Sequence, residues 1–334
     1  MDNEQDLYDL TIIGGGTTGL FGAYYAGMRD MKTKILEYHS DIGGKVSFFY
    51  PEKMIYDVGG IPGVMGEELV EQMKDQALSV HPELVTGVYV TSLQKQADGT
   101  FAIRTSDNQT HYSKTVLLAT GFGTFDMVPL NVEERTEYEN HSIHYTINHM
   151  DQFSNKTVMV VSSGRIGIDW ALALESRAEK VYLINKGDTF QHVSDADLTA
   201  LQQSTVEVST QSSVTSLTGS GQQLTQAEVY HQQEDTSRSL KIDHILVYEG
   251  LKMEKAPFED WGLDTDKNRL TVKNNMETSE EGVFAAGDAV NYPNKTTLIA
   301  SGYSEAMTAV NSAKTHIEPT ASKQVYSTVV YRKK

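Results

Sequence analysis

A strand-like apolar stretch, Leu7–Ile13, runs directly into the glycine-rich turn GGGTTG, the feature that most constrains how this chain folds. Gly14 permits a tight turn from strand to helix, Gly16 lets the backbone approach a pyrophosphate at the helix N-terminus, and Gly19 allows close helix–strand packing. Glu37 ends a second apolar strand about 20 residues further on, where an acidic side chain accepts hydrogen bonds from a ribose. A solvated glutamate after a glycine-rich turn would leave this spacing unexplained. The segment therefore predicts a βαβ unit that binds a dinucleotide.

The same order of strand, turn and helix occurs a second time from Thr157 onward. Residues 158–161 are an apolar run typical of a buried parallel strand, and residues 162–167 form the turn. Residues 168–175 are expected to form a helix and residues 181–184 the next strand. Two nucleotide-binding units in one chain indicate transfer between two nucleotides.

Two further apolar runs that end in glycine turns mark where the chain passes between these units. Residues 116–121 end in Ala-Thr-Gly, and residues 282–288 repeat that form and end in Asp288. A long helix is expected over 296–316, where apolar residues recur at helical intervals. We therefore expect an α/β fold of two Rossmann-like, three-layer domains, the second inserted in the first. The expected bounds are 1–120 and 245–334 for the first domain and 121–244 for the second.

The composition excludes several kinds of partner. Of the 334 residues 39% are hydrophobic and 22% charged, and Lys+Arg 28 against Asp+Glu 45 gives a net charge of −17. Such a field repels nucleic acid and anionic membrane surfaces, so neither is an expected partner. No apolar run is long enough to span a membrane, and the acidic start of the chain is unlike a signal segment. We therefore expect a cytoplasmic protein.

The cysteine count is zero, which excludes disulfides, thiolate metal sites and dithiol redox centres. Any redox chemistry must then belong to a bound cofactor. The ten histidines show no metal-ligand pattern: His141, His144 and His149 are close in sequence, but nothing predicts a helix that would bring them together. We therefore predict no metal site.

Six short segments match the motifs of one family: 14–19, 42–45, 50–57, 261–264, 285–288 and 305–314. Through them nearly the whole chain resembles the thioredoxin-reductase-like class of ferredoxin/flavodoxin–NAD(P)+ reductases, which are FAD enzymes without a redox disulfide. The Tyr-Pro-Glu-Lys run at 50–53 and the residues beyond the last helix separate this class from its relatives. The resemblance implies FAD as the cofactor, a homodimer, and ferredoxin or flavodoxin as the candidate redox partner.

The resemblance places FAD in the first domain. The glycines and threonine of the first turn correspond to the pyrophosphate contacts, Glu37 to the contact with the adenosine ribose, and Val90 to a backbone contact with adenine. Phe125 corresponds to an aromatic FAD contact, and Asp288 to a contact with the ribityl chain or the flavin-side phosphate. The residues assigned to FAD in this way are Gly14, Gly16, Thr18, Gly19, Glu37, Lys45, Tyr50, Val90, Phe125, Asp288 and Thr328.

Three residues carry the catalytic roles that the resemblance implies. Tyr50 matches the ring that stacks on one face of the flavin and excludes water; the alternative is an ordinary core tyrosine. On the other face the family has a histidine contributed across the dimer, whereas this chain has Tyr326, which can stack but cannot carry a proton near neutral pH. Thr328 remains to form a hydrogen bond near flavin N5. The N-terminus of the helix at 296–316 is expected to point at the pyrimidine ring and stabilise the reduced flavin.

The second turn departs from the family pattern. Ser162 replaces the first glycine and adds a Cβ at the tight turn, Arg165 replaces an acid, and Ile166 replaces a small polar residue where phosphate would lie. Downstream, only Lys186 remains of three cations that hold the 2′-phosphate of NADP in the family. NADH or NADPH is therefore expected to bind weakly, at Gly164, Arg165 and Lys186, without strong preference for NADPH.

Lys45 stands where the family has a glutamine, and it either brings positive charge near the flavin or its phosphates or is simply solvated. Three functions fit these features. The first is an NAD(P)H-dependent FAD oxidoreductase, the second a flavoprotein that takes electrons from another carrier, and the third a regulatory or redox-sensing protein that keeps FAD. Because ferredoxin and flavodoxin are acidic, a subunit of charge −17 needs a local basic patch to attract them.

Overall fold

The computed structural model describes residues 6–139, 141–147, 150–254 and 258–322. The chain divides into two compact units: unit 1 is Met1–Thr124 with Glu254–Lys334, and unit 2 is Phe125–Met253. Two short strands that pair with each other, β9 (Thr124–Met127) and β18 (Leu251–Glu254), carry the chain out of unit 1 and back. The return expected at residue 245 would fall inside β17 (His244–Tyr248). Since β17 belongs to the sheet of unit 2, the chain returns only after that strand.

Unit 1 is built on a seven-stranded sheet in the order β5-β2-β1-β8-β7-β6; the seventh strand, β21, lies off this path and pairs with the end of β8 at residues 116–118. The strands that carry the dinucleotide-binding pattern are parallel to one another, whereas β7 and β6 are antiparallel additions. The strand bounds are β1 (Leu7–Ile13), β2 (Thr33–Leu36), β5 (Glu83–Val85), β6 (Val90–Lys95), β7 (Phe101–Thr105), β8 (Thr110–Leu118) and β21 (Val283–Ala285).

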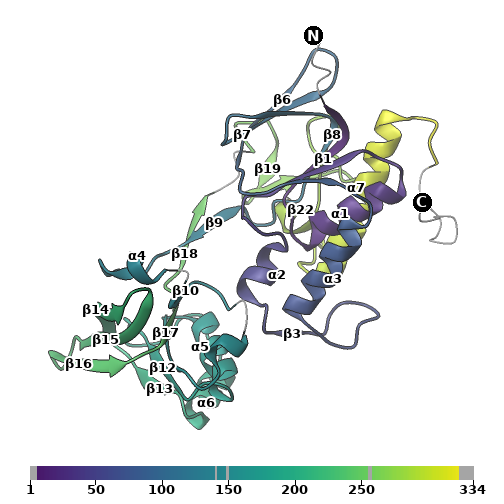
Figure 1. Ribbon diagram of the computed structural model, residues 1–334. Coiled ribbons are helices and arrows are strands. Elements are labelled where there is room, and N and C mark those ends of the chain that lie inside the picture. Colours follow the sequence, from purple (N-terminus) through teal and green to yellow (C-terminus); the bar gives the residue numbers. More distant parts are fainter. Residues whose placement is uncertain (1–5, 140, 148–149, 255–257, 323–334) are drawn as a thin grey trace. The chain divides into compact units, whose positions relative to one another are not determined.

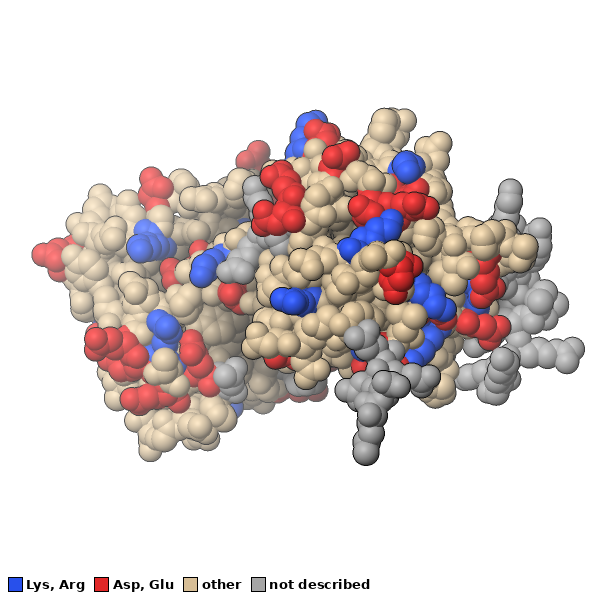
Figure 2. Space-filling model, turned by 90° about the horizontal axis from the view of Figure 1, so that it is seen from above, with Lys and Arg blue, Asp and Glu red and all other residues tan. Residues whose placement is uncertain are grey.

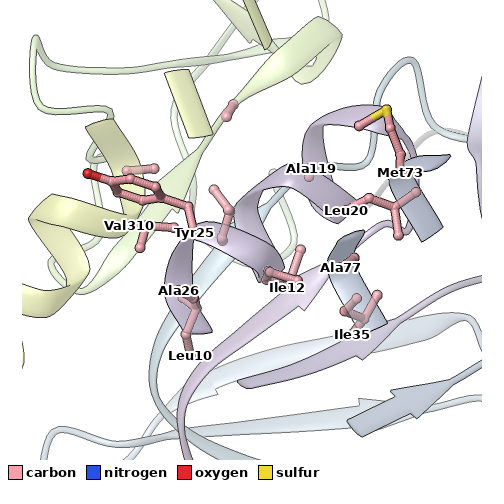
Figure 3. Packing of buried hydrophobic residues seen from close by; sticks show 14 of the residues in the cluster. Leu10, Ile12, Leu20, Tyr25, Ala26, Ile35, Met73, Ala77, Ala119 and Val310 are labelled. Carbon is pink, nitrogen blue, oxygen red and sulfur yellow. The ribbon is translucent and has the colours of Figure 1, made fainter. Parts of the chain in front are cut away.

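Helices from both ends of the chain pack together on the sheet of unit 1. Figure 1 shows α7 (Ile299–Ile317), in yellow, beside α1 (Thr17–Met28), in purple, and α1 also contacts α3 (Gly66–Leu78). Figure 3 shows the core between these elements, where side chains from β1, α1 and α7 such as Leu10, Ile12, Leu20, Ala26 and Val310 are buried together. This burial of apolar surface is what stabilises unit 1.

The last helix begins three residues later than the sequence pattern suggested. Leu298 is its N-cap residue and has extended backbone angles, φ −108° and ψ 153°. The Ser301 hydroxyl accepts a hydrogen bond from the Leu298 N–H at 3.2 Å and donates one to the Thr296 carbonyl at 2.8 Å. These bonds hold residues 296–298 outside the helix, so apolar spacing alone could not locate its start.

Unit 2 has a five-stranded parallel sheet in the order β10-β17-β11-β12-β13. Helices α5 (Arg165–Glu175) and α6 (Asp195–Gln203) follow β11 and β12, and a three-stranded antiparallel sheet is inserted before β17. The strand bounds are β10 (Ile143–His144), β11 (Thr157–Ser162), β12 (Lys180–Ile184), β13 (Glu207–Ser209), β14 (Ser212–Ser220), β15 (Gln223–His231) and β16 (Thr236–Lys241).

The remaining elements are short. They are α2 (Gly44–Phe49), β3 (Met54–Ile55), β4 (Val64–Met65), α4 (Arg135–Tyr138), η1 (Met150–Phe153), β19 (Thr265–Asp266), β20 (Arg269–Thr271), η2 (Gly287–Ala289) and β22 (Val290–Asn291). Among the described residues no helix combines the length and apolar character needed to cross a lipid bilayer.

Candidate functional site

Each glycine of the first turn is favoured for a different physical reason. Gly14 has φ +109°, and a Cβ on it would lie 2.4 Å from the carbonyl oxygen of Ala119. A Cβ on Gly19 would lie 1.9 Å from the Gly14 carbonyl oxygen. Gly16 has an extended backbone, with φ −73° and ψ −177°, and the atom nearest to a Cβ on it would be the Gly44 Cα, at 3.8 Å. Protein packing thus requires glycine at 14 and 19, whereas the space over Gly16 is open to a ligand.

The open turn also presents unpaired donors of the helix. No side chain caps the N-terminus of α1, and no acidic residue lies in its first turn. The first N–H groups of a helix lack intrahelical partners and carry the positive end of its dipole. The turn therefore fits a pyrophosphate, the anionic centre of a dinucleotide.

Glu37 is buried at the end of β2, where it is 7% exposed. Its Oε2 accepts a hydrogen bond from the Gly15 N–H at 2.6 Å, and its Oε1 accepts one from the His39 N–H at 2.8 Å. These bonds fix the carboxylate beside the glycine turn, and each oxygen keeps a second lone pair for a ribose hydroxyl. The contact with Gly15 was not expected from the sequence.

The structure brings Lys45 and Asp288 together from distant parts of the chain. The Lys45 Nζ lies 3.8 Å from Asp288 Oδ2, and it lies 5.7 Å from the centre of the Phe122 ring. Lys45 is on α2 and Asp288 on η2, so three segments meet at this point. Of the two readings left open for Lys45, the pairing with an expected cofactor contact favours positive charge near the cofactor site.

Thr18 packs helix α1 against the turn at Asp288. A Cβ on Gly287, which has φ +78°, would lie 2.7 Å from Thr18 Oγ1, and a Cβ on Gly302 would lie 2.4 Å from the same oxygen. Two glycines thus make room for this side chain. Thr18 therefore has a packing role in unit 1 as well as the expected role at the pyrophosphate.

A buried ionic network supports the turn at Asp288. Two of its members, Tyr292 and Lys295, were not singled out in the sequence. Glu305 Oε2 accepts a hydrogen bond from the Gly287 N–H at 2.7 Å, and its Oε1 accepts one from Lys295 Nζ at 2.6 Å and one from the Tyr292 hydroxyl. The side chains of Lys295 and Glu305 are only 4% and 5% exposed. Burial and Glu305 raise the pKa of Tyr292 to about 12. Nothing in the spacing of Lys295 marks it as a partner of Glu305.

The other residues assigned to FAD lie as follows. Tyr50 is half-buried at the C-terminal end of α2, with Lys53 Nζ 5.4 Å from the centre of its ring. Val90 is buried in β6, opposite Thr105. Phe125 is buried in β9 and falls in unit 2, not in unit 1 with the glycine turn. Tyr326 and Thr328 lie outside the described residues.

The second glycine turn is less crowded than its sequence suggests. Ser162 has no positive φ, and a Cβ on Gly167 would lie 2.1 Å from the Ser162 Cβ. The missing side chain at 167 thus provides the space that the Ser162 side chain takes, so Ser162 does not crowd the turn itself. The hydroxyl has a different consequence: Ser162 Oγ accepts a hydrogen bond from the Gly164 N–H at 3.2 Å. One donor of the expected pyrophosphate site is therefore already engaged.

The charges around the second turn are also paired within the protein. Arg165 Nε lies 3.8 Å from Asp169 Oδ2 and 3.8 Å from Asp197 Oδ2, so two carboxylates offset the cation that was expected to face the helix dipole. A Cβ on Gly164 would have the Gln191 carbonyl oxygen as its nearest atom, at 3.7 Å. The backbone at Gly164 is therefore as open to a ligand as that at Gly16.

The loop after β12 is held by a buried amide instead of presenting cations. Asn185 is fully buried; its Oδ1 accepts a hydrogen bond from the Gly187 N–H at 2.8 Å and its Nδ2 donates one to the Thr189 carbonyl at 2.9 Å. Beside this loop, burial raises the pKa of Glu249, and the charge of Lys186 opposes that shift. Within the described part of the chain, no group of three or more His, Cys, Asp or Glu residues could hold a metal ion.

Comparison with known proteins agrees with this geometry. The family model described as "Pyridine nucleotide-disulphide oxidoreductase" matches residues 8–313. Ferredoxin–NADP reductase 1 of Bacillus velezensis is 37% identical over 329 residues, which cover 98% of each chain. Ferredoxin–NADP reductase of Geobacillus kaustophilus is 41% identical over 321 residues, or 96% of each chain. Ferredoxin–NADP reductase 2 of Shouchella clausii is 42% identical over 322 residues, covering 96% of this chain and 97% of that one.

Solved structures share the fold. The thioredoxin reductase of T. acidophilum superposes with a TM-score of 0.67 at 23% identity, covering 93% of this chain and 99% of that one. That of Lactococcus lactis gives a TM-score of 0.66 at 20% identity, with the same two coverages. The expected α/β fold with two nucleotide-binding sheets is therefore confirmed, as is the expected family. The chain belongs to the pyridine nucleotide-disulphide oxidoreductase family and is a ferredoxin–NADP reductase-like oxidoreductase that contains no cysteine.

Proposed function

We propose that this chain binds FAD in unit 1 and passes electrons between a nicotinamide nucleotide and ferredoxin or flavodoxin. The observation that carries the proposal is the room over Gly16, where a Cβ would meet only the Gly44 Cα, next to Gly15, whose N–H donates to the buried Glu37. Bound FAD would supply the conversion of a two-electron donor into one-electron transfers. The residues of the chain bind and orient it: the glycine turn holds the phosphates, Glu37 the ribose, and Tyr50 one face of the ring system.

The protein partner is proposed from the names of the relatives, which are ferredoxin–NADP reductases. On the face shown in Figure 2, Lys and Arg side chains are interspersed with Asp and Glu among the described residues. Complementary charge mainly raises the association rate, and a net charge of −17 opposes an acidic partner. We therefore propose local contacts near the flavin as the basis of recognition. A homodimer is part of the same proposal, since Tyr326 and Thr328 are assigned to the flavin of the partner subunit.

The test of this function is the visible spectrum followed by anaerobic reduction. The purified protein is expected to be yellow with bound FAD, and NADH or NADPH should bleach it under anaerobic conditions. Because the described chain offers no cluster of cations around Lys186, the two nucleotides should differ by no more than about tenfold, or about 1.4 kcal/mol. A colourless protein that takes up no FAD would contradict the proposal. Rapid reduction by NADPH alone would contradict only the predicted lack of preference.

A second candidate is a flavoprotein that takes its electrons from another carrier. The observation that favours it is the hydrogen bond from the Gly164 N–H to Ser162, because that amide would otherwise face the nucleotide pyrophosphate. A protein that is yellow but not reduced by either nucleotide would support this candidate over the first.

Removing the side chain at 162 and adding a methyl group at 167 should strengthen nucleotide binding. The variant Ser162→Gly/Gly167→Ala removes the hydroxyl that engages the Gly164 N–H and fills the space that it leaves, since a Cβ on Gly167 points at Ser162. We expect the Kd for NAD+ and for NADP+, which cannot reduce the flavin, to fall by about tenfold, which is about 1.4 kcal/mol. Titration calorimetry on the FAD-loaded protein measures this.

The matched control is Gly167→Ala alone. Its Cβ would lie 2.1 Å from the Ser162 Cβ, so it should lower the free energy of unfolding by about 1–3 kcal/mol without a gain in affinity. If the double variant binds both nucleotides no more tightly than the wild type, the Ser162 hydroxyl does not limit binding.

A further inference from the structure

The inference concerns Lys45 and rests on the proposed binding of FAD. The Lys45 Nζ lies 3.8 Å from Asp288 Oδ2, near the outer limit of an ion pair, and the two side chains are 49% and 27% exposed. Pairs with such geometry and exposure contribute little to stability. The ammonium group of Lys45 can therefore leave Asp288 for a ligand without a large loss.

The backbone around Lys45 is tied to the turn that would hold the pyrophosphate. Gly43 forms a β-bridge with Gly16, and the Gly43 N–H donates a hydrogen bond to the Gly15 carbonyl at 2.8 Å. Gly44 has φ +60°, and a Cβ on it would lie 2.9 Å from the Gly16 Cα. Lys45 is the next residue, so its flexible side chain starts beside the open space over Gly16.

In this chain the site combines carboxylates with an anionic ligand. Glu37 and Asp288 are carboxylates, and FAD brings an anionic pyrophosphate to the same turn. Carboxylates near the turn disfavour an anionic ligand, and a neighbouring cation weakens this repulsion. Lys45 is placed to interact with Asp288 and, over the turn, with the phosphates. Its ammonium also lies over the Phe122 ring, 5.7 Å from the ring centre.

We propose that Lys45 is a charge-compensating residue that determines FAD affinity: it offsets Asp288 so that the site accepts an anionic dinucleotide. An uncharged residue at 45 leaves Asp288 uncompensated, and FAD then binds more weakly at low salt. Since the effect is electrostatic, salt should screen it. Salt dependence therefore separates this role from simple packing.

The experiment is FAD titration of the apoprotein, followed by flavin fluorescence at low and at high NaCl concentration. Lys45→Gln should raise the Kd about tenfold at low salt, and the difference from the wild type should shrink at high salt. Lys45→Arg keeps the charge and should bind FAD like the wild type. The control is Lys114→Gln, which makes the same charge change in an ion pair of similar exposure, 42% and 22% with Asp9, at the other end of β1; it should leave the Kd unchanged.

Each outcome decides the proposal. If Lys45→Gln and the wild type bind FAD equally at both salt concentrations, Lys45 is an ordinary surface lysine, although the proposed function stands. An equal loss of affinity in Lys45→Gln and Lys114→Gln would mean that the net charge of the protein, and not the position of Lys45, causes the loss. This result would also overturn the proposal. If the wild type itself binds no FAD at either salt concentration, both the inference and the proposed function fail.

Discussion

Replacing Lys295 by Met is expected to lower the free energy of unfolding by about 3–5 kcal/mol, because it leaves a buried carboxylate without its counter-charge. Glu305 is 5% exposed, and Lys295 Nζ donates a hydrogen bond to it at 2.6 Å. The remaining donors, the Gly287 N–H and the Tyr292 hydroxyl, are neutral and offset only part of the cost. Urea unfolding of the apoprotein measures the change.

The double variant Lys295→Met/Glu305→Gln is the control. It removes both charges and keeps a side chain that can accept the Gly287 N–H, so it should recover a large part of the lost stability. The same pair is expected to matter for cofactor binding, since Glu305 holds the turn that carries Asp288. An unchanged urea midpoint in Lys295→Met would mean that solvent reaches Glu305 and that the pair is not buried in solution.

Gly19→Ala is expected to impair folding, whereas Gly16→Ala is expected to impair FAD binding with little effect on folding. A Cβ on Gly19 would lie 1.9 Å from the Gly14 carbonyl oxygen, and neither backbone can move without opening the turn between β1 and α1. Gly19→Ala should therefore destabilise the apoprotein by about 3 kcal/mol, the upper part of the range for overpacking. A Cβ on Gly16 meets only the Gly44 Cα, at the ordinary contact distance of 3.8 Å.

The apoprotein of Gly16→Ala should consequently unfold within about 1 kcal/mol of the wild type, yet bind FAD at least about 100-fold more weakly, which is about 2.7 kcal/mol. The Cβ would occupy the space through which the backbone approaches the phosphates. Unfolding curves of the two apoproteins and FAD titrations of both check the pair. Wild-type affinity in Gly16→Ala would show that the pyrophosphate does not lie over this glycine.

The sequence pattern predicts structure well where the role of a residue depends on its near neighbours in the chain. The strand Leu7–Ile13 was expected with the bounds that β1 has, because an apolar run next to a glycine turn reflects burial and turn geometry directly. The second turn shows the limit of reading residues one at a time. Ser162 adds a Cβ at the tight turn, but the absence of a side chain at Gly167 makes room for it. Ser162 and Gly167 have to be considered together, because the side chain of one occupies the space that the other leaves.

The class of fold, the two glycine turns and the position of Glu37 can be predicted from the amino-acid sequence, because they follow from periodicity and from the conformations that glycine allows. Which charged side chains meet is known only from the three-dimensional structure. Lys45 pairs with Asp288, and Lys295 with Glu305, through the folding of separate segments onto one turn. Spacing along the chain says nothing about such contacts, since the energy of a charge depends on what lies within a few ångströms of it and on how much water remains there.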